Sequence, residues 1–129
     1  KGLYVYCTKG LRTGDFTSIY NLYDFAVSYM AANNITPRNP ALWDIVASTW
    51  RTWGQLPAFY NNLQVSRVSF FRRSDVTKWH EALTEVSPSR VLRHGWSDGT
   101  MRVFTMAMFA EEDWVLTKTH DGYRHGRAV

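Results

Sequence analysis

Five segments of the chain carry the alternating, β-branched and aromatic residues that are typical of β-strands. They span residues 3–7, 63–71, 90–96, 101–109 and 114–119, and the second and the fourth are the longest. Ser97-Asp98-Gly99 stands between the third and fourth segments, and Asp121-Gly122 follows the fifth. Because Asp-Gly pairs favour tight hairpin turns, the C-terminal half is predicted to form a β-meander.

Three other segments place their apolar residues at helical spacing. They run from a cap at Thr17 or Ser18 to Asn33, from the Asn39-Pro40 cap to Gly54, and from the Ser74-Asp75 cap to Ser87. The predicted order is therefore β-α-α-β-α-β-β-β. Such an order favours an α/β fold with a mixed β-sheet flanked by about three helices. We expect one globular domain over residues 1–129.

The composition adds a basic charge and many aromatic rings to this picture. The formal net charge is +4, the apolar share is 45%, and the chain has six Trp, seven Tyr and seven Phe. Twenty rings exceed what one small core needs, so we expect some of them at an interaction surface. The positive charge favours acidic partners, above all nucleic acid.

The single cysteine and the absence of long apolar runs narrow the setting. Cys7 has no second cysteine to pair with, so we predict an intracellular, reducing compartment and no zinc site built on several thiolates. No apolar run approaches the roughly 18 residues of a membrane helix. The N-terminus also lacks the apolar stretch of a signal peptide. We therefore expect no membrane partner.

No segment has the pattern of a catalytic centre. Cys7 alternates with apolar residues in a predicted strand, which is typical of a buried hydrophobic side chain. No serine lies in a Gly-x-Ser-x-Gly setting. The carboxylates of Glu111-Glu112-Asp113 follow one another at a predicted turn, where they are usually solvated. We predict a protein that is not an enzyme and that needs no cofactor and no metal.

A set of basic residues recurs along the strands predicted for the second half. We expect these residues to bind nucleic acid: Arg67, Arg72, Arg73, Lys78, Arg90, Arg93 and Arg102. If the strands are neighbours, the side chains converge, with Phe70, Phe71, Trp79 and Trp96 interleaved. Guanidinium groups on phosphates beside stacking rings suit single-stranded RNA. The alternative is an ordinary solvated face.

Two further groups of residues are candidates for binding. Lys9, Gly10, Arg12 and Thr13 form a glycine-containing loop between a predicted strand and helix, where an anion or phosphate could bind. The alternative there is an ordinary turn. Trp43, Trp50 and Trp53 share one predicted helix and are candidates for a protein interface, including a homodimer, or for core packing.

The opening residues Gly2-Leu3-Tyr4-Val5-Tyr6-Cys7-Thr8-Lys9-Gly10 resemble the first strand and loop of a BRCT-type domain. In phosphopeptide-binding members a Ser or Thr followed by Gly contacts phosphate, and Thr8 and Gly10 are the nearest matches. Lys9 separates them here. The family's final helix with its buried tryptophan is also not evident, which puts phosphopeptide binding in doubt.

The whole chain resembles the globular core of the packaging and assembly cofactor of cystoviruses, the segmented double-stranded RNA phages. The resemblance rests on length, on the α/β order, on the basic residues and on residues 124–129, which read like the start of a basic tail. It implies a homodimer in the viral polymerase complex within the virion core. It also implies contacts with RNA and with capsid or polymerase proteins, and no catalytic residues.

The sequence therefore favours a non-enzymatic RNA-binding and protein-interaction module of a viral polymerase and packaging complex. Two alternatives stay open. One is a domain for protein–protein interaction alone, with dimerisation through the tryptophan helix. The other is a small metal-dependent nuclease around His120, Asp121 and His125, whose spacing fits no standard ligand pattern.

Overall fold

The computed structural model of the protein describes residues 4–6, 12–13, 21–59, 64–84 and 95–117. Within these ranges the helices are α1 (Leu22–Ala32), α2 (Pro40–Trp53), α3 (Val68–Phe71), α4 (Ser74–Thr84), α6 (Asp98–Phe109) and the 3-10 helix η2 (Glu112–Trp114). The strands are β1 (Tyr4–Tyr6), β2 (Arg12–Thr13), β3 (Pro57–Ala58), β4 (Gln64–Ser66) and β5 (Val115–Thr117).

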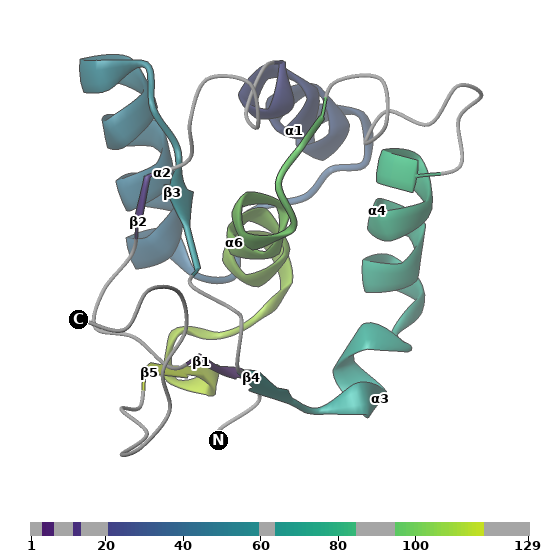
Figure 1. The fold of residues 1–129 in the computed structure, drawn as a ribbon. Coiled ribbons are helices and arrows are strands. Elements are labelled where there is room, and N and C mark those ends of the chain that lie inside the picture. Colours follow the sequence, from purple (N-terminus) through teal and green to yellow (C-terminus); the bar gives the residue numbers. More distant parts are fainter. Residues whose placement is uncertain (1–3, 7–11, 14–20, 60–63, 85–94, 118–129) are drawn as a thin grey trace.

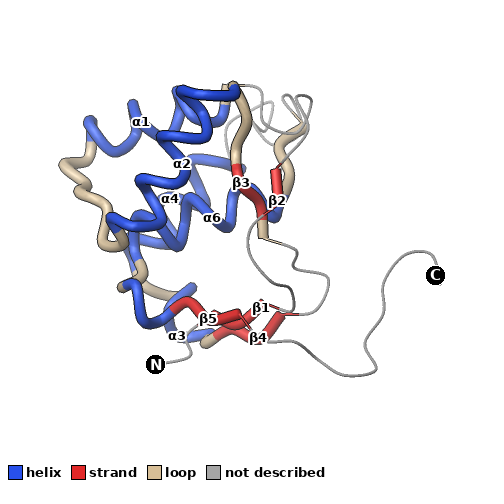
Figure 2. The backbone as a smooth tube through the Cα atoms, turned by 90° about the vertical axis from the view of Figure 1, so that its left-hand side faces the viewer, coloured by secondary structure: helices blue, strands red, loops and turns tan. Residues whose placement is uncertain are grey.

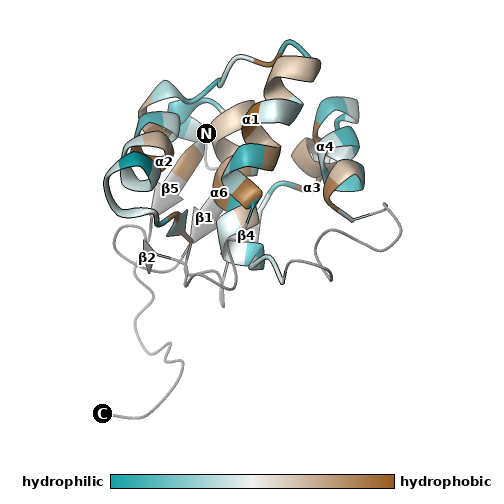
Figure 3. Ribbon diagram, turned by 90° about the horizontal axis from the view of Figure 1, so that it is seen from above, coloured by the Kyte–Doolittle hydropathy of each residue, from teal (hydrophilic) through white to brown (hydrophobic). Residues whose placement is uncertain are grey.

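Helix α6 lies at the centre, with α1, α2 and α4 around it (Figure 1). Every residue from 103 to 110 is buried, and the fully buried side chains include Val103, Phe104 and Met106. Figure 3 shows hydrophobic residues of α1 and α6 towards the middle of the molecule and hydrophilic residues on α2 and α4. The core is therefore formed by helices packed on a central helix.

The predicted mixed β-sheet flanked by helices is wrong, because the described chain is predominantly helical and its strands are only two or three residues long. Strands β4, β1 and β5 form one small sheet in that order, and β2 pairs with β3 in a second. The three-stranded sheet and α3 lie at one end of the molecule, with α1 at the other (Figure 2).

The largest difference from the predicted elements is α6, which occupies one of the two longest predicted strands. Residues 101–109 are apolar except for Arg102 and Thr105, and a short, mostly apolar run fits a buried strand or a buried helix equally well. The expected hairpin turn at residues 97–99 is the start of this helix. Gly99 meets a packing need there: a Cβ atom on it would lie 2.5 Å from the carbonyl oxygen of Phe59.

The other predicted strands are confirmed only in part. The segment 63–71 contains β4, but it continues into helix α3 instead of extending as a strand. Strand β5 lies within the predicted segment 114–119 and pairs in parallel with β1, with Val5 opposite Leu116, so it does not belong to a meander. Strand β1 itself is confirmed, and it also pairs antiparallel with β4.

Helices α1, α2 and α4 confirm the predicted helical segments, and α2 also confirms its predicted ends. The side chain of Asn39 accepts a hydrogen bond of 3.0 Å from the backbone N–H of Leu42, and Pro40 occupies the first turn. Gly54 ends the helix in the left-handed conformation at φ 62°. The cap predicted at Thr17 or Ser18 and the helix end predicted at Ser87 lie outside the described residues.

The last four carbonyl groups of α6, which have no partner inside the helix, are all hydrogen-bonded. The backbone N–H of Ala110 donates to Met106. The backbone N–H groups of Asn39 and Arg38 donate to Ala107 and Met108. The guanidinium group of Arg73 donates to Phe109. The carbonyl groups at the C-terminal end of α6 therefore accept hydrogen bonds from the residues before α2, from Arg73 before α4 and from Ala110.

Candidate nucleic-acid interface

The short helix α3 brings two exposed arginines next to two aromatic rings. Arg67 precedes the helix in an extended conformation and Arg72 follows it, and both are exposed. Phe70 points into the core with 2% of its surface exposed, whereas Phe71 is only half-buried. The two rings meet edge to face with their centroids 4.9 Å apart. The helix thus anchors itself through one ring and presents the other near the surface.

The ring of Phe71 meets side chains of two other helices, contacting an arginine and stacking with a histidine. The guanidinium carbon of Arg102, from α6, lies 4.5 Å from the centroid of the Phe71 ring. The imidazole of His80, from α4, stacks with the same ring at 6.1 Å and an interplanar angle of 16°. Three helices therefore contribute to one cluster of a guanidinium group and two rings, an arrangement typical of cation–π contacts.

Arg73 is held by contacts inside the protein. Its guanidinium group binds the carboxylate of Asp75 through two hydrogen bonds of 3.1 and 2.6 Å and lies 5.3 Å from the centroid of Phe70. It also donates to the carbonyl oxygen of Phe109 at 3.4 Å. Partial burial tends to raise the pKa of Asp75, but hydrogen bonds from Arg73 and its charge outweigh this and lower that pKa below 3.8. Arg73 therefore has a structural role that the exposed Arg67 and Arg72 do not share.

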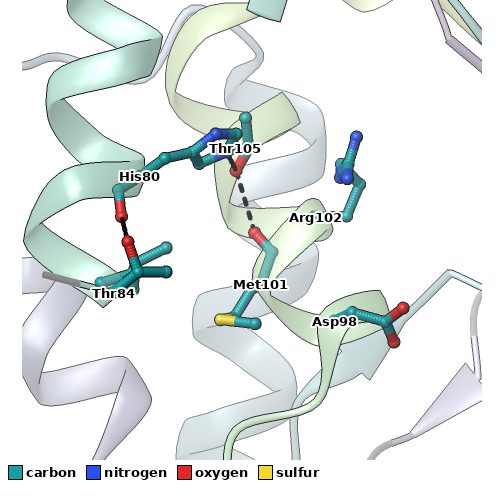
Figure 4. A pocket seen from close by; sticks show the side chains of 7 residues that line it. His80, Thr84, Asp98, Met101, Arg102 and Thr105 are labelled. Atoms are coloured by element: carbon teal, nitrogen blue, oxygen red, sulfur yellow. Dashed lines mark hydrogen bonds between the residues drawn. The ribbon is translucent and has the colours of Figure 1, made fainter. Parts of the chain in front are cut away.

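A pocket of about 100 Å³ opens between α4 and α6 (Figure 4). Both helices contribute to its walls: His80, Leu83 and Thr84 come from α4, and Asp98, Met101, Arg102 and Thr105 come from α6. The α6 residues recur at the helical spacing that puts side chains on one face. The pocket adjoins the α3 cluster, because His80 and Arg102 belong to both.

The hydroxyl group of Thr105 organises the inner side of this pocket. Its one hydrogen is donated to the carbonyl oxygen of Met101 at 3.1 Å, and its oxygen accepts from Trp79 Nε1 at 3.0 Å. The contact of 3.3 Å with His80 Nε2 is therefore one in which the imidazole donates. Burial, and to a smaller extent the charge of Arg102, lowers the pKa of His80 below 6.5. The imidazole is neutral near pH 7.

The structure gathers four of the predicted nucleic-acid-binding residues around α3 and leaves a fifth apart. Arg67, Arg72, Arg73 and Arg102 flank the helix or stack on its rings. Lys78 is exposed on α4, two residues before His80, which places it on nearly the opposite face of that helix. Arg102 reaches the cluster from a helix and not from the strand predicted for it.

Several other predicted residues cannot be placed with their side chains. Arg90, Arg93, Lys9 and Gly10 lie outside the described residues, as do His120, Asp121 and His125. Arg12 and Thr13 form β2, which pairs with β3, and nothing is described of their side chains. Among the residues that the structure does describe, no group of three His, Cys, Asp or Glu side chains is arranged to hold a metal ion.

The three tryptophans of the predicted protein interface have different surroundings. Trp43 and Trp50 are partly buried and both stack on Tyr23 of α1, with ring centroids 5.9 and 5.4 Å apart. Trp53, at the end of α2, is 73% exposed. The core-packing alternative therefore describes Trp43 and Trp50, and Trp53 alone among the three presents its ring to the surface.

Sequence reasoning missed the pocket, together with the contribution of His80, Met101 and Thr105. Assigning residues 101–109 to a strand puts neighbouring positions on opposite faces. The positions of Asp98, Met101, Arg102 and Thr105 follow an i, i+3, i+4, i+7 pattern in the sequence. That pattern is the signal that could have indicated a lined helix face.

No protein-family model, curated protein or solved structure matches the chain. Over the ranges that the structure describes, none of the helices has the length and apolar character needed to span a bilayer.

Proposed function

We propose that the chain is a non-enzymatic RNA-binding and protein-interaction module that binds single-stranded RNA at the α3 corner, defined as Arg67, Phe71, Arg72 and Arg102. The observation that carries the proposal is the guanidinium group of Arg102 at 4.5 Å from the half-buried ring of Phe71. Guanidinium groups bind phosphates, and aromatic rings stack on bases. Both kinds of group meet at this corner.

The charge of the corner supports RNA over an uncharged partner. Arg67 and Arg72 are exposed at the two ends of α3. The carboxylate nearest to them in sequence, that of Asp75, is paired with Arg73. The net charge of the chain, +4, adds a long-range attraction for phosphates. Binding that neutralises several phosphates releases counterions, so its affinity falls as the salt concentration rises.

The test compares two arginines of equal charge and similar exposure. Arg72 lies at the α3 corner, and Arg51 is exposed in the last turn of α2. We expect Arg72→Gln to weaken binding of a short labelled single-stranded RNA, measured by fluorescence anisotropy, and to lower the slope of log affinity against log salt by about 1. Arg51→Gln should change neither quantity.

Two results would count against RNA binding at this corner. Equal effects of Arg72→Gln and Arg51→Gln would mean that only the net charge attracts RNA. An affinity that does not change with salt concentration would show that the arginines do not contact phosphates. Double Arg67→Gln/Arg72→Gln substitution gives a stronger version of the same comparison, because both side chains are exposed and the fold does not depend on them.

A second candidate function, protein–protein interaction through α2, is favoured by its outer face. Trp53 is 73% exposed and Ile45 is 45% exposed. Exposed tryptophans are common anchors of protein interfaces. If copies of the chain associate through this face, the weight-average mass in analytical ultracentrifugation should rise with protein concentration, and Trp53→Gln should abolish the rise. A monomer at all concentrations would exclude such a homodimer.

The wider setting rests on the resemblance alone and stays a prediction. It comprises a viral polymerase and packaging complex, with capsid or polymerase proteins as partners and a virion core as the location. The metal-dependent nuclease around His120, Asp121 and His125 is a separate prediction, and these residues lie outside the described part of the chain.

A further inference from the structure

The pocket between α4 and α6 has the size and wall chemistry of a site for one small neutral ring. Its volume of about 100 Å³ is well below the roughly 300 Å³ at which pockets for drug-sized ligands begin. Leu83 and Met101 provide apolar walls, and His80 adds an aromatic ring to the lining. Figure 4 shows the side chains of His80 and Met101 beside the space between the two helices.

The hydroxyl groups that line the pocket already have hydrogen-bond partners within the protein. The hydroxyl of Thr105 has partners in Trp79, His80 and Met101. The hydroxyl of Thr84 donates to the backbone carbonyl oxygen of His80 at 2.8 Å. An occupant can therefore enter without leaving these hydroxyls unpaired, and its apolar faces contact Leu83 and Met101.

The two opposite charges in the lining favour neither an anion nor a cation over a neutral occupant. Asp98 carries a negative charge and Arg102 a positive charge, while His80 is neutral near pH 7. A phosphate inside the pocket would meet the carboxylate, and an ammonium group would meet the guanidinium group. A neutral planar group avoids both repulsions.

We propose that this pocket binds one unstacked base of the RNA whose backbone passes the α3 corner. The inference rests on the proposed function and names a finer feature of it. Arg102 connects the two sites, because its guanidinium group stacks on Phe71 while its side chain lines the pocket. Proteins that bind single strands commonly combine basic surfaces for the backbone with apolar or aromatic sites for the bases.

The first test uses the full chain and two RNA strands of equal length and equal phosphate number. One strand is intact, and the other lacks all of its bases. Because a stacked base contributes about 1–3 kcal/mol, the intact strand should bind roughly 5- to 150-fold more tightly than the abasic one. This comparison needs no variant, so it does not depend on whether a substituted chain folds.

The second test assigns that preference to the pocket. Thr84→Trp places a large ring at the exposed edge of the pocket, and Thr52→Trp places the same ring on the exposed side of α2 as a control. We expect the preference for intact RNA to shrink towards unity in Thr84→Trp and to persist in Thr52→Trp. Shifts of the Met101 and Leu83 methyl signals on addition of intact RNA, and not of abasic RNA, would agree with this.

The outcomes separate the pocket from the RNA-binding function. Equal affinities for the intact and abasic strands, or a preference that Thr84→Trp leaves unchanged, would overturn the base site while phosphate binding by the arginines of the α3 corner stands. If neither strand binds even at low salt, the proposed function fails, and the base site fails with it.

Discussion

The guanidinium group of Arg73 donates a hydrogen bond of 3.4 Å to the carbonyl oxygen of Phe109, 36 residues further along the chain. The same group binds the carboxylate of Asp75 through two more hydrogen bonds. One side chain thus joins the start of α4 to the C-terminal end of α6, where a positive charge also interacts favourably with the helix dipole.

Replacing Arg73 with alanine should therefore affect stability, whereas the same change at its neighbour should not. We expect Arg73→Ala to lower the free energy of unfolding by about 1–2 kcal/mol, since the carbonyl of Phe109 and the carboxylate of Asp75 lose a charged partner. Arg72→Ala, at an exposed position, should stay within about 0.5 kcal/mol of the wild type. Urea denaturation measures both, and equal losses would show that Arg73 is not a structural contact.

Gly99 should tolerate no side chain. A Cβ atom there would lie 2.5 Å from the carbonyl oxygen of Phe59, which is backbone and cannot move aside easily. We expect Gly99→Ala to cost about 1–3 kcal/mol of stability.

Gly54 provides the control for this substitution, because no described residue lies within 4 Å of its Cβ position and its φ is 62°. Gly54→Ala should cost about 1–2 kcal/mol through backbone strain alone. Asparagine tolerates the left-handed conformation, so Gly54→Asn should recover part of the loss, while Gly99→Asn should be worse than Gly99→Ala. Recovery by asparagine at both positions would contradict the crowding at Gly99.

Two buried threonines of α6 should respond in opposite ways to valine, which has the same shape. The hydroxyl of Thr100 is buried and has no hydrogen-bond partner among the residues that the structure describes, so Thr100→Val should raise the free energy of unfolding by about 1 kcal/mol. The hydroxyl of Thr105 accepts from Trp79 Nε1, so Thr105→Val should lower it by about 1–3 kcal/mol. Chemical denaturation measures both changes. A lower free energy of unfolding for Thr100→Val would mean that the Thr100 hydroxyl has a hydrogen-bond partner in solution.

His80 should make the fold sensitive to mild acid. Burial, helped by the charge of Arg102, holds its pKa below the ordinary value of 6.5, so the unfolded chain takes up a proton at a higher pH than the folded chain. The free energy of unfolding should therefore be unaffected above this range and fall as the pH drops through about 6.5 towards the lower folded pKa.

The measurement is a series of urea titrations between about pH 8 and 5 for the wild type and His80→Gln. The variant should show a shallower loss of stability over this range, whatever its absolute stability. Asp75 does not interfere, because its pKa is lowered from 3.8 and the stability that it contributes is lost only in stronger acid. If the stability of the two proteins fell equally with pH, His80 would not be the group responsible for the acid sensitivity.

The contrast between α2 and α6 explains which elements could be predicted from the sequence. The ends of α2 are encoded locally: Asn39 caps the N-terminus, Pro40 follows it, and Gly54 takes the left-handed conformation after the last turn. Such signals act within a few residues of one another, so a reader of the sequence can find them. Helix α6 has only a narrow polar face, with Asp98, Arg102 and Thr105, and the elements that bury its other sides lie elsewhere in the chain.

The sequence predicted the basic residues of the site and the rings among them, but not how they contact one another. The basic residues near α3 were identifiable from composition, and Arg67, Arg72, Arg73 and Arg102 do lie around one short helix. Their different roles depend on contacts across the fold, such as the carbonyl of Phe109 beside Arg73 and the ring of Phe71 beneath Arg102. Contacts between distant segments leave no local pattern, so the pocket and the structural role of Arg73 required the coordinates.

The position of β1 between β4 and β5 has a consequence for how the chain is made. The first described strand pairs with residues 64–66 on one side and with residues 115–117 on the other. Strand β5 is synthesised only after α6. One edge of β1 therefore stays unpaired while nearly all of the described chain is synthesised. Closing so large a loop is slow. The final step in acquiring the native structure is therefore expected to be the joining of the two ends of the described chain, after release or emergence of the C-terminal strand.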